Sequence, residues 1–260
     1  MIVERDVWLS EQLGRDAFRV AVEPRVGTTA GEARDSVDPD MHFLSSCFPA
    51  RAAQEQPAFY YAKVPTQQVE TVAALTTLGF RVVDVNITLS CAPRLITNPV
   101  CHAGLVVREA TARDADTILA IAASCFRYSR FHLDPEIAVE RAHAIKRAWI
   151  QSYFERRRGE QLLAAFADER PVGFLAVLKT KVKEKPGRVI DLIGVDHSLQ
   201  RCGVGKALVG AFLVDCTKQG TLAVVGTQAA NVPSLRLYEA MGFRVCDTAY
   251  VLHAHVGRKG

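Results

Sequence analysis

The sequence predicts an α/β protein built on a mixed sheet with helices on both faces, together with a smaller N-terminal α/β domain. Two patterns in the second half predict this fold class: several strand-like runs follow one another, and helices then alternate with strands. The third observation is size, because a chain of 260 residues, 49% of them hydrophobic, can bury a sizeable core.

The first half contains one well-defined stretch, residues 59–91. It has an apolar run, a helix with apolar residues at helical spacing, a glycine and a β-rich run. Residues 91–104 carry two prolines and little periodicity, which predicts a linker. We therefore place an N-terminal domain at residues 1–104 and a second domain at residues 105–260.

The second half begins with a strand-like run at residues 105–111, a helix that starts near Asp114 and a polar and aromatic connection. A second helix is predicted at residues 138–158. The elements that follow are predicted from β-forming runs, turn residues and helical periodicity. They are strands at 161–167, 171–182 and 188–195, with turns at 168–169 and 183–187, then a helix at 205–218, a strand at 221–228, a helix at 231–242 and a strand at 244–256.

Residues 75–84 and 238–247 resemble each other. Both have a helix end, a glycine, Phe-Arg-Val and an acidic residue one position later. One explanation is shared local chemistry, because glycine followed by a β-former is a common helix stop. The other is a partial duplication, in which the first half is a reduced copy of the second without its glycine loop. Both explanations stay open.

Composition excludes several classes of partner and site. The net charge of +4 is spread along the chain, so no nucleic-acid partner is indicated. Seven cysteines without a CxxC pair or a His/Cys cluster at zinc spacing favour a reducing compartment and no metal site. The first residues lack a signal-peptide core, and no apolar run reaches the roughly 18 residues of a membrane span. We expect a cytoplasmic protein without a membrane partner.

A glycine-rich loop, Gln-Arg-Cys-Gly-Val-Gly at residues 200–205, lies where a strand ends and a helix starts. It is not a nucleotide-binding P-loop, because position 200 is Gln and position 207 is Ala. It is not a dinucleotide fingerprint, because Leu208 occupies the third glycine position. Bare backbone at a helix start suits a pyrophosphate. Lys206 and Arg201 either add charge to that ligand or are solvated.

The order of strand, Q-x-x-G-x-G, helix, strand, Asn and LYEAMGF resembles the GCN5-related N-acetyltransferase (GNAT) family over residues 106–256. The resemblance implies a mostly antiparallel sheet, acetyl-CoA as co-substrate and no metal. It also implies that the strand before the loop splays from the next strand, leaving amides free for the cofactor. The residues that it assigns to the pyrophosphate are Gln200, Arg201, Gly203, Val204, Gly205 and Lys206; those assigned to the rest of the cofactor are Ile193 and Val195 at the pantetheine arm, Asn231, and Tyr238 near the thioester sulfur.

The chemistry explains the choice of Tyr238. Aminolysis of a thioester needs a neutral amine, hydrogen-bond donors for the oxyanion and a proton for the departing thiolate. A phenol with a pKa of about 10 can protonate a thiolate whose thiol has a pKa of about 8.5. The alternative for Tyr238 is a core aromatic on a helix face, because Leu235 and Met241 lie at helical spacing from it. No cysteine is placed as an acyl carrier, so direct transfer through a ternary complex is expected.

A narrower resemblance concerns the amine. The chain resembles the bacterial TDP-fucosamine acetyltransferases in several short motifs: SRF at 129–131, TQ-x-x-N, TAY-x-L and part of the first half. This implies a nucleotide-linked amino deoxysugar as small-molecule partner, with Ser129, Arg130 and Phe131 over its pocket. By this resemblance Asp84 lies at the position of the proposed general base, and Asp191 is the alternative candidate for that role. The alternatives are a solvated strand residue for Asp84 and a core residue for Phe131.

Two other functions remain open. The first is acetylation of another amine, such as a protein amino group or an aminoglycoside. The second is a non-catalytic sensor that binds acyl-CoA. The sequence also leaves a homodimer open.

Overall fold

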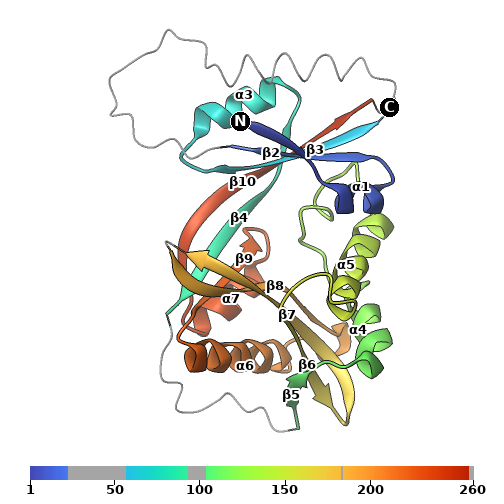
Figure 1. Ribbon diagram of the computed structural model, residues 1–260, viewed down its shortest axis with the longest axis vertical. Coiled ribbons are helices and arrows are strands. Elements are labelled where there is room, and N and C mark those ends of the chain that lie inside the picture. Colours follow the sequence, from blue (N-terminus) through green and yellow to red (C-terminus); the bar gives the residue numbers. More distant parts are fainter. Residues whose placement is uncertain (23–56, 93–103, 183, 258–260) are drawn as a thin grey trace. The chain divides into compact units, whose positions relative to one another are not determined.

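The computed structural model describes residues 1–22, 57–92, 104–182 and 184–257 (Figure 1). The chain divides into two compact units. The first unit comprises Met1–Asn86, Leu133–Glu136 and Thr248–Gly260, and the second comprises Ile87–His132 and Ile137–Asp247. The predicted linker lies mostly outside the described residues, and the domain boundary at residue 104 stays a prediction.

The first unit contains three elements that the sequence analysis did not predict. These are β1 (Ile2–Arg5), α1 (Val7–Leu13) and β2 (Asp16–Ala21). The predicted strand, helix and strand follow as β3 (Ala58–Pro65), α3 (Val69–Thr77) and β4 (Arg81–Cys91). The strand order is β1-β2-β3-β10, where β10 (Arg244–Val256) enters from the second unit. The core of this unit includes Tyr60, Leu75 and Phe80.

The second unit contains the remaining elements, which agree with the predicted order. They are β5 (Val106–Glu109), η1 (Ala112–Asp114), α4 (Ala115–Ala122), α5 (Val139–Phe154), β6 (Gln161–Ala167), β7 (Arg170–Val182), β8 (Lys185–Val195), η2 (His197–Leu199), α6 (Val204–Gln219), β9 (Leu222–Gln228) and α7 (Val232–Ala240). The strand order is β4-β9-β8-β7-β6-β5. Among the described residues, the strand pairs with a defined register are antiparallel except β2–β3 and β8–β9, which are parallel. The mixed, mostly antiparallel α/β fold is therefore confirmed.

Helices cover both faces of the second unit's sheet, as predicted (Figure 1). One core cluster joins α6 and Tyr238 of α7 to one sheet face, and the other joins α4 and α5 to the opposite face. Figure 1 shows α4 and α5 on one side of these strands and α6 on the other. Among the described residues, no helix is both long and apolar enough to cross a membrane.

Two predicted boundaries were wrong by three residues or more. The turn at 183–187 is shorter, because the β7–β8 register extends to Val182 and Lys185. The helix predicted to reach residue 158 ends at Phe154, and Arg156 has a φ of 54°, which a helix cannot continue.

The internal similarity has a common geometry. Gly79 and Gly242 both have a φ of 90°, and the next residue's N–H bonds back into the helix: Phe80 to the Leu75 carbonyl and Phe243 to the Tyr238 carbonyl, each at 3.0 Å. Leu75 thus occupies the position of Tyr238 in the first unit.

Candidate functional site

Strand β8 loses one of its two neighbours before it ends. Its parallel register with β9 stops at Ile190 and Val225, although β8 continues to Val195 and β9 to Gln228. The antiparallel register with β7 shifts between Ala176 and Val177, and it resumes beyond Asp191. Backbone amides that leave a ladder need another partner. The last part of β8 therefore offers such groups on the β9 side, as the resemblance implied.

The glycine loop joins this strand end to α6. Arg201 has a φ of 65° and Gly203 a φ of 86°, so the backbone is left-handed at both positions. Gly203 is the N-cap of α6, and no side chain caps this turn. The first intrahelical bond runs from the Ala207 N–H to the Gly203 carbonyl at 3.0 Å. The N–H groups before it have no acceptor within the helix, which makes this turn an anion-binding position.

Two glycines let the start of α6 pack closely. A Cβ at Gly173 of β7 would lie 2.9 Å from the Gly194 carbonyl and 2.9 Å from Val204 Cγ1. A Cβ at Gly205 would lie 3.2 Å from Leu237 Cδ2 of α7. Because Val204 is buried against this surface, the first turn of α6 is held close to the end of β8.

The other predicted cofactor residues lie near these elements. Ile193 and Val195 pack against the core cluster that contains Val204 and Tyr238. Gln200, Arg201 and Lys206 are exposed, and Gln200 Nε2 lies 3.1 Å from His197 Nδ1. Asn231 is the N-cap of α7, where its Oδ1 accepts from the Ser234 N–H at 3.4 Å.

Tyr238 is a core residue by position. Its side chain is 2% exposed, and its ring centroid lies 5.7 Å from that of Phe243. Burial raises the pKa of its phenol, so the group keeps its proton at neutral pH. A protonated Tyr238 phenol suits a general acid. The packing of its ring also suits a residue with a purely structural role.

Asp191 is held by four hydrogen bonds from three side chains. Its carboxylate accepts from Trp149 Nε1 and Tyr153 Oη at 2.8 Å each, and from Arg158 Nε and a terminal nitrogen at 2.8 and 2.9 Å. The Asp191 side chain is 9% exposed. An arginine and two neutral donors thus already occupy both oxygens of this carboxylate. This environment favours a positioning role for Asp191.

The predicted acceptor residues share one connection between α4 and α5. Ser129 is buried, and its Oγ lies 2.6 Å from His132 Nδ1. Phe131 is 1% exposed, as its core alternative predicted. The Arg130 guanidinium lies over the Phe131 ring, 4.6 Å from its centroid. Burial, His143 and Lys146 lower the pKa of the His132 imidazole to about 4, so it is neutral.

Sequence reasoning missed Lys146, which faces this connection. Its side chain on α5 is 6% exposed. Its Nζ lies 5.1, 5.9 and 4.7 Å from the ring centroids of Phe126, Phe131 and Trp149. The signal was present, because Lys146 lies four residues after Ala142 and three before Trp149, on the apolar face of the helix.

Asp84 belongs to the first unit. It lies in β4 and is 7% exposed, so its alternative as a solvated strand residue is wrong. Its proposed role as base stays a prediction.

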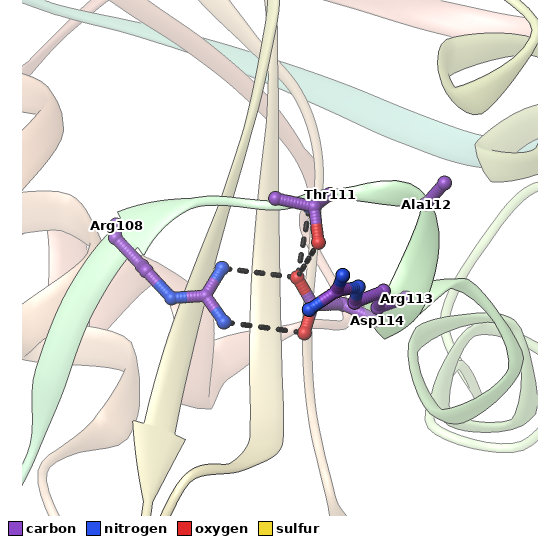
Figure 2. Close-up of a pocket in the computed structure, with 5 residues that line it drawn as sticks. All are labelled: Arg108, Thr111, Ala112, Arg113 and Asp114. Carbon is purple, nitrogen blue, oxygen red and sulfur yellow. Dashed lines mark hydrogen bonds and ion pairs between the residues drawn. The ribbon is translucent and has the colours of Figure 1, made fainter.

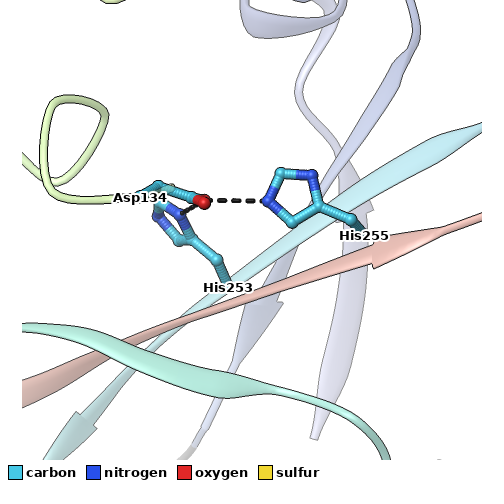
Figure 3. Close-up of side chains that lie close together, drawn as sticks. All are labelled: Asp134, His253 and His255. Atoms are coloured by element: carbon cyan, nitrogen blue, oxygen red, sulfur yellow. Dashed lines mark hydrogen bonds and ion pairs between the residues drawn. The ribbon is translucent and has the colours of Figure 1, made fainter. Parts of the chain in front are cut away.

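Asp134, His253 and His255 form a buried cluster in the first unit (Figure 3). Asp134 Oδ2 lies 2.6 Å from His253 Nδ1 and 2.8 Å from His255 Nε2. Arg15 lies 2.7 Å from His255 Nδ1, and a guanidinium can only donate. His255 therefore accepts at Nδ1 and donates from Nε2 to Asp134. A metal on Nε2 would place a proton on Nδ1 against Arg15, so the cluster fits a hydrogen-bonded network and not a metal centre.

A surface pocket of about 440 Å³ lies near the start of α4 (Figure 2). Its lining residues are Arg108, Thr111, Ala112, Arg113 and Asp114. In Figure 2 the Asp114 carboxylate lies between Arg108 and Thr111. It accepts hydrogen bonds of 2.8–3.3 Å from the Arg108 guanidinium and from the backbone N–H and hydroxyl of Thr111. Asp114 closes a helix capping box, and no predicted site residue lines this pocket.

Known proteins resemble this chain in sequence and fold. Residues 116–243 match the model of the acetyltransferase (GNAT) family. The "Spore coat polysaccharide biosynthesis protein SpsD" of Bacillus subtilis (strain 168) is 26% identical over 151 residues, which cover 56% of this chain and 49% of that protein. The match thus spans about half the length of that curated relative.

Two solved structures align with nearly the whole chain. A GCN5-related N-acetyltransferase from Kribbella flavida aligns with a TM-score of 0.57 and 18% identity, over 92% of this chain and 81% of that one. A tandem GNAT protein from the clavulanic acid biosynthesis pathway aligns with a TM-score of 0.61 and 15% identity, over 94% of this chain and 76% of that one. At these identities the likeness concerns the fold, and the second alignment includes both units.

Proposed function

Residues 116–243 form an acetyltransferase domain of the GNAT family, and we propose that the chain is an acetyl-CoA-dependent N-acetyltransferase that acylates a nucleotide-linked amino deoxysugar by direct transfer. One observation carries the cofactor half of this proposal. The uncapped first turn of α6 follows directly on a strand, β8, whose last residues have left the register with β9. An anion site and a row of backbone amides are thus joined in one chain segment.

The cofactor residues divide between two tasks. The N–H groups of Gly203, Val204, Gly205 and Lys206 would bind the pyrophosphate, flanked by Gln200 and Arg201. Ile193, Val195 and Asn231 would line the remainder, and acetyl-CoA supplies the thioester that the amine attacks. Free amides of β8 would hold the oxyanion, and loss of a single such donor lowers rates by roughly 10² to 10³.

Proton transfer completes the proposal. Tyr238 would protonate the departing thiolate, because burial keeps its phenol protonated. Of the two candidate bases, we retain Asp84, acting directly or through water. Asp191 would position β8, because four hydrogen bonds already engage its carboxylate.

The acceptor assignment is supported by the connection between α4 and α5 and by one relative. Ser129, Arg130 and Phe131 would contact the nucleotide sugar. The similar Bacillus subtilis protein is described as a spore coat polysaccharide biosynthesis protein, which supports a sugar-related acceptor. Burial of Tyr238 in the core favours a second candidate, a non-catalytic protein that binds acyl-CoA.

The test measures release of the CoA thiol with a panel of TDP- and UDP-linked amino sugars, together with lysine peptides and aminoglycosides. Acetyl-CoA binding is measured separately by calorimetry. We expect turnover with an amino sugar nucleotide. Turnover only with peptides or aminoglycosides would overturn the acceptor class, and binding without any turnover would support the second candidate.

A further inference from the structure

Lys146 is a buried cation to which the proposed acetyl transfer assigns no role. Its side chain is 6% exposed and lies over Phe126, Phe131 and Trp149. Among the residues that the structure describes, its Nζ has no hydrogen bond and no ion pair. An ammonium group that is largely removed from water and has no acceptor is unfavourable, so such a group indicates a ligand.

The charges around Lys146 are mostly positive. The ionisable groups that interact electrostatically with it are Arg130, Asp191, Cys125, Arg158 and His132. Asp191 is the one carboxylate among them, and Arg158, Trp149 and Tyr153 already occupy it. Arg130 Cζ and Lys146 Nζ lie 4.6 and 5.9 Å from the same ring centroid, that of Phe131. Both cationic side chains therefore lie against the same aromatic ring.

This cationic group adjoins the end of β8. A Cβ at Gly194 would lie 2.6 Å from Cys125 Sγ, so Cys125 packs directly on the part of β8 that has left the β9 register. Cys125 also interacts electrostatically with Lys146. A group held by Lys146 would therefore lie beside the strand to which the thioester is assigned.

We propose that Lys146 and Arg130 form an anion subsite that binds a phosphate group of the acceptor substrate. This inference rests on the proposed acetyltransferase function, whose acceptor class it specifies. A phosphate offers several charged oxygens that can accept from an arginine and a lysine at the same time, and an arginine beside a lysine suits such a group. A cationic acceptor would meet repulsion here.

The experiment measures binding of dTDP, inorganic pyrophosphate, thymidine and glucuronate by calorimetry, with saturating CoA present to fill the cofactor site. The variants are Lys146→Met, Lys146→Arg and the control Lys218→Met, which removes an exposed lysine at the end of α6. We expect Lys146→Met to weaken dTDP and pyrophosphate about 10- to 100-fold, with CoA affinity unchanged. Lys146→Arg and Lys218→Met should retain binding.

Proton uptake separates a ligand contact from a packing effect. Burial and Arg130 lower the pKa of Lys146 to about 8, and a bound anion would raise it again. At pH 8, dTDP binding to the wild type should therefore take up a fraction of a proton, and this uptake should vanish in both Lys146 variants.

Three results would overturn the subsite. They are equal dTDP binding by wild type and Lys146→Met, no dTDP or pyrophosphate binding by the wild type, or a Lys146 effect confined to glucuronate. None of these depends on turnover. Failure of the acetyltransferase proposal would instead appear as absence of acetyl transfer with intact binding.

Discussion

Removal of the Lys146 charge should stabilise the protein in the absence of ligands. The change is Lys146→Met, which keeps the length of the side chain and its contact with the three rings. The pKa of this lysine falls from 10.5 to about 8. At about 1.36 kcal/mol per pH unit, the charged form destabilises the folded state by about 3 kcal/mol. The three cation–π contacts, at about 0.5–1 kcal/mol each, oppose this term by about 1.5–3 kcal/mol, so a net gain of about 0–2 kcal/mol is expected at pH 7.

The gain should depend on pH in a defined direction. Between pH 8 and 10.5 the unfolded chain holds a proton on this lysine that the folded chain has released. The free energy of unfolding of the wild type therefore rises with pH in this window relative to the variant. The advantage of Lys146→Met should be largest at pH 7 and should shrink as the pH approaches 10.

The assay is urea unfolding of the wild type, Lys146→Met and Lys218→Met at pH 7, 8, 9 and 10. Lys218 is exposed, and its removal should give no pH-dependent difference. A Lys146→Met protein that is less stable than the wild type at pH 7 would refute the reasoning. A difference that stays constant from pH 7 to 10 would refute it as well, because the ammonium would then have a permanent partner.

Four further predictions concern other groups. Asp191→Asn should destabilise the protein by about 1–3 kcal/mol in urea unfolding, because it removes the charged acceptor of Arg158, Trp149 and Tyr153. The exposed control Glu155→Gln should change little, and a lost rate with intact stability would make Asp191 a base instead. Tyr238→Phe should lower kcat by about 10² or more in the CoA-release assay with an unchanged melting temperature, and full activity would exclude it as the acid. Gly173→Ala should raise the KM for acetyl-CoA, because its Cβ would meet Val204 and Gly194. Gly220→Ala strains the left-handed end of α6 but has open space around it, so it should leave this KM unchanged. Asp134→Asn should destabilise the first unit at pH 7. Burial raises the pKa of Asp134, but hydrogen bonds from His253 and His255 hold this pKa below 3.8. The stability difference from the wild type should therefore decline below pH 4 in acid unfolding, and a pH-independent difference would contradict this.

The sequence predicted those elements whose signals are local. β6 and β10 begin and end at the predicted residues, because each is a β-forming run bounded by turn residues. The glycine loop was found because left-handed φ angles and close packing favour glycine. The short α1 was missed although Asp6 caps its start and Gly14 its end, since seven residues give little periodicity.

The site residues that were missed depend on contacts between distant segments. Lys146 is unusual only because Phe126 and Phe131 come from another segment to meet it, and no local pattern predicts such a meeting. The environment of Asp191 depends on the register shift opposite Ala176 and Val177. The sequence shows an acid in a strand, and only the fold shows that four hydrogen bonds engage it.

The Asp191 network explains how β8 tolerates a free edge. A strand that leaves its neighbour loses ladder bonds and would fray unless another contact fixes it. Asp191 lies at the β7–β8 register shift, one residue after the last β9 pair, and there α5 and Arg158 hold it. The Asp191 side chain thus anchors β8 on one face of the sheet, at the point where the backbone of β8 separates from β9. Removal of this anchor should therefore disturb acetyl-CoA binding as well as stability, although Asp191 would touch no cofactor atom.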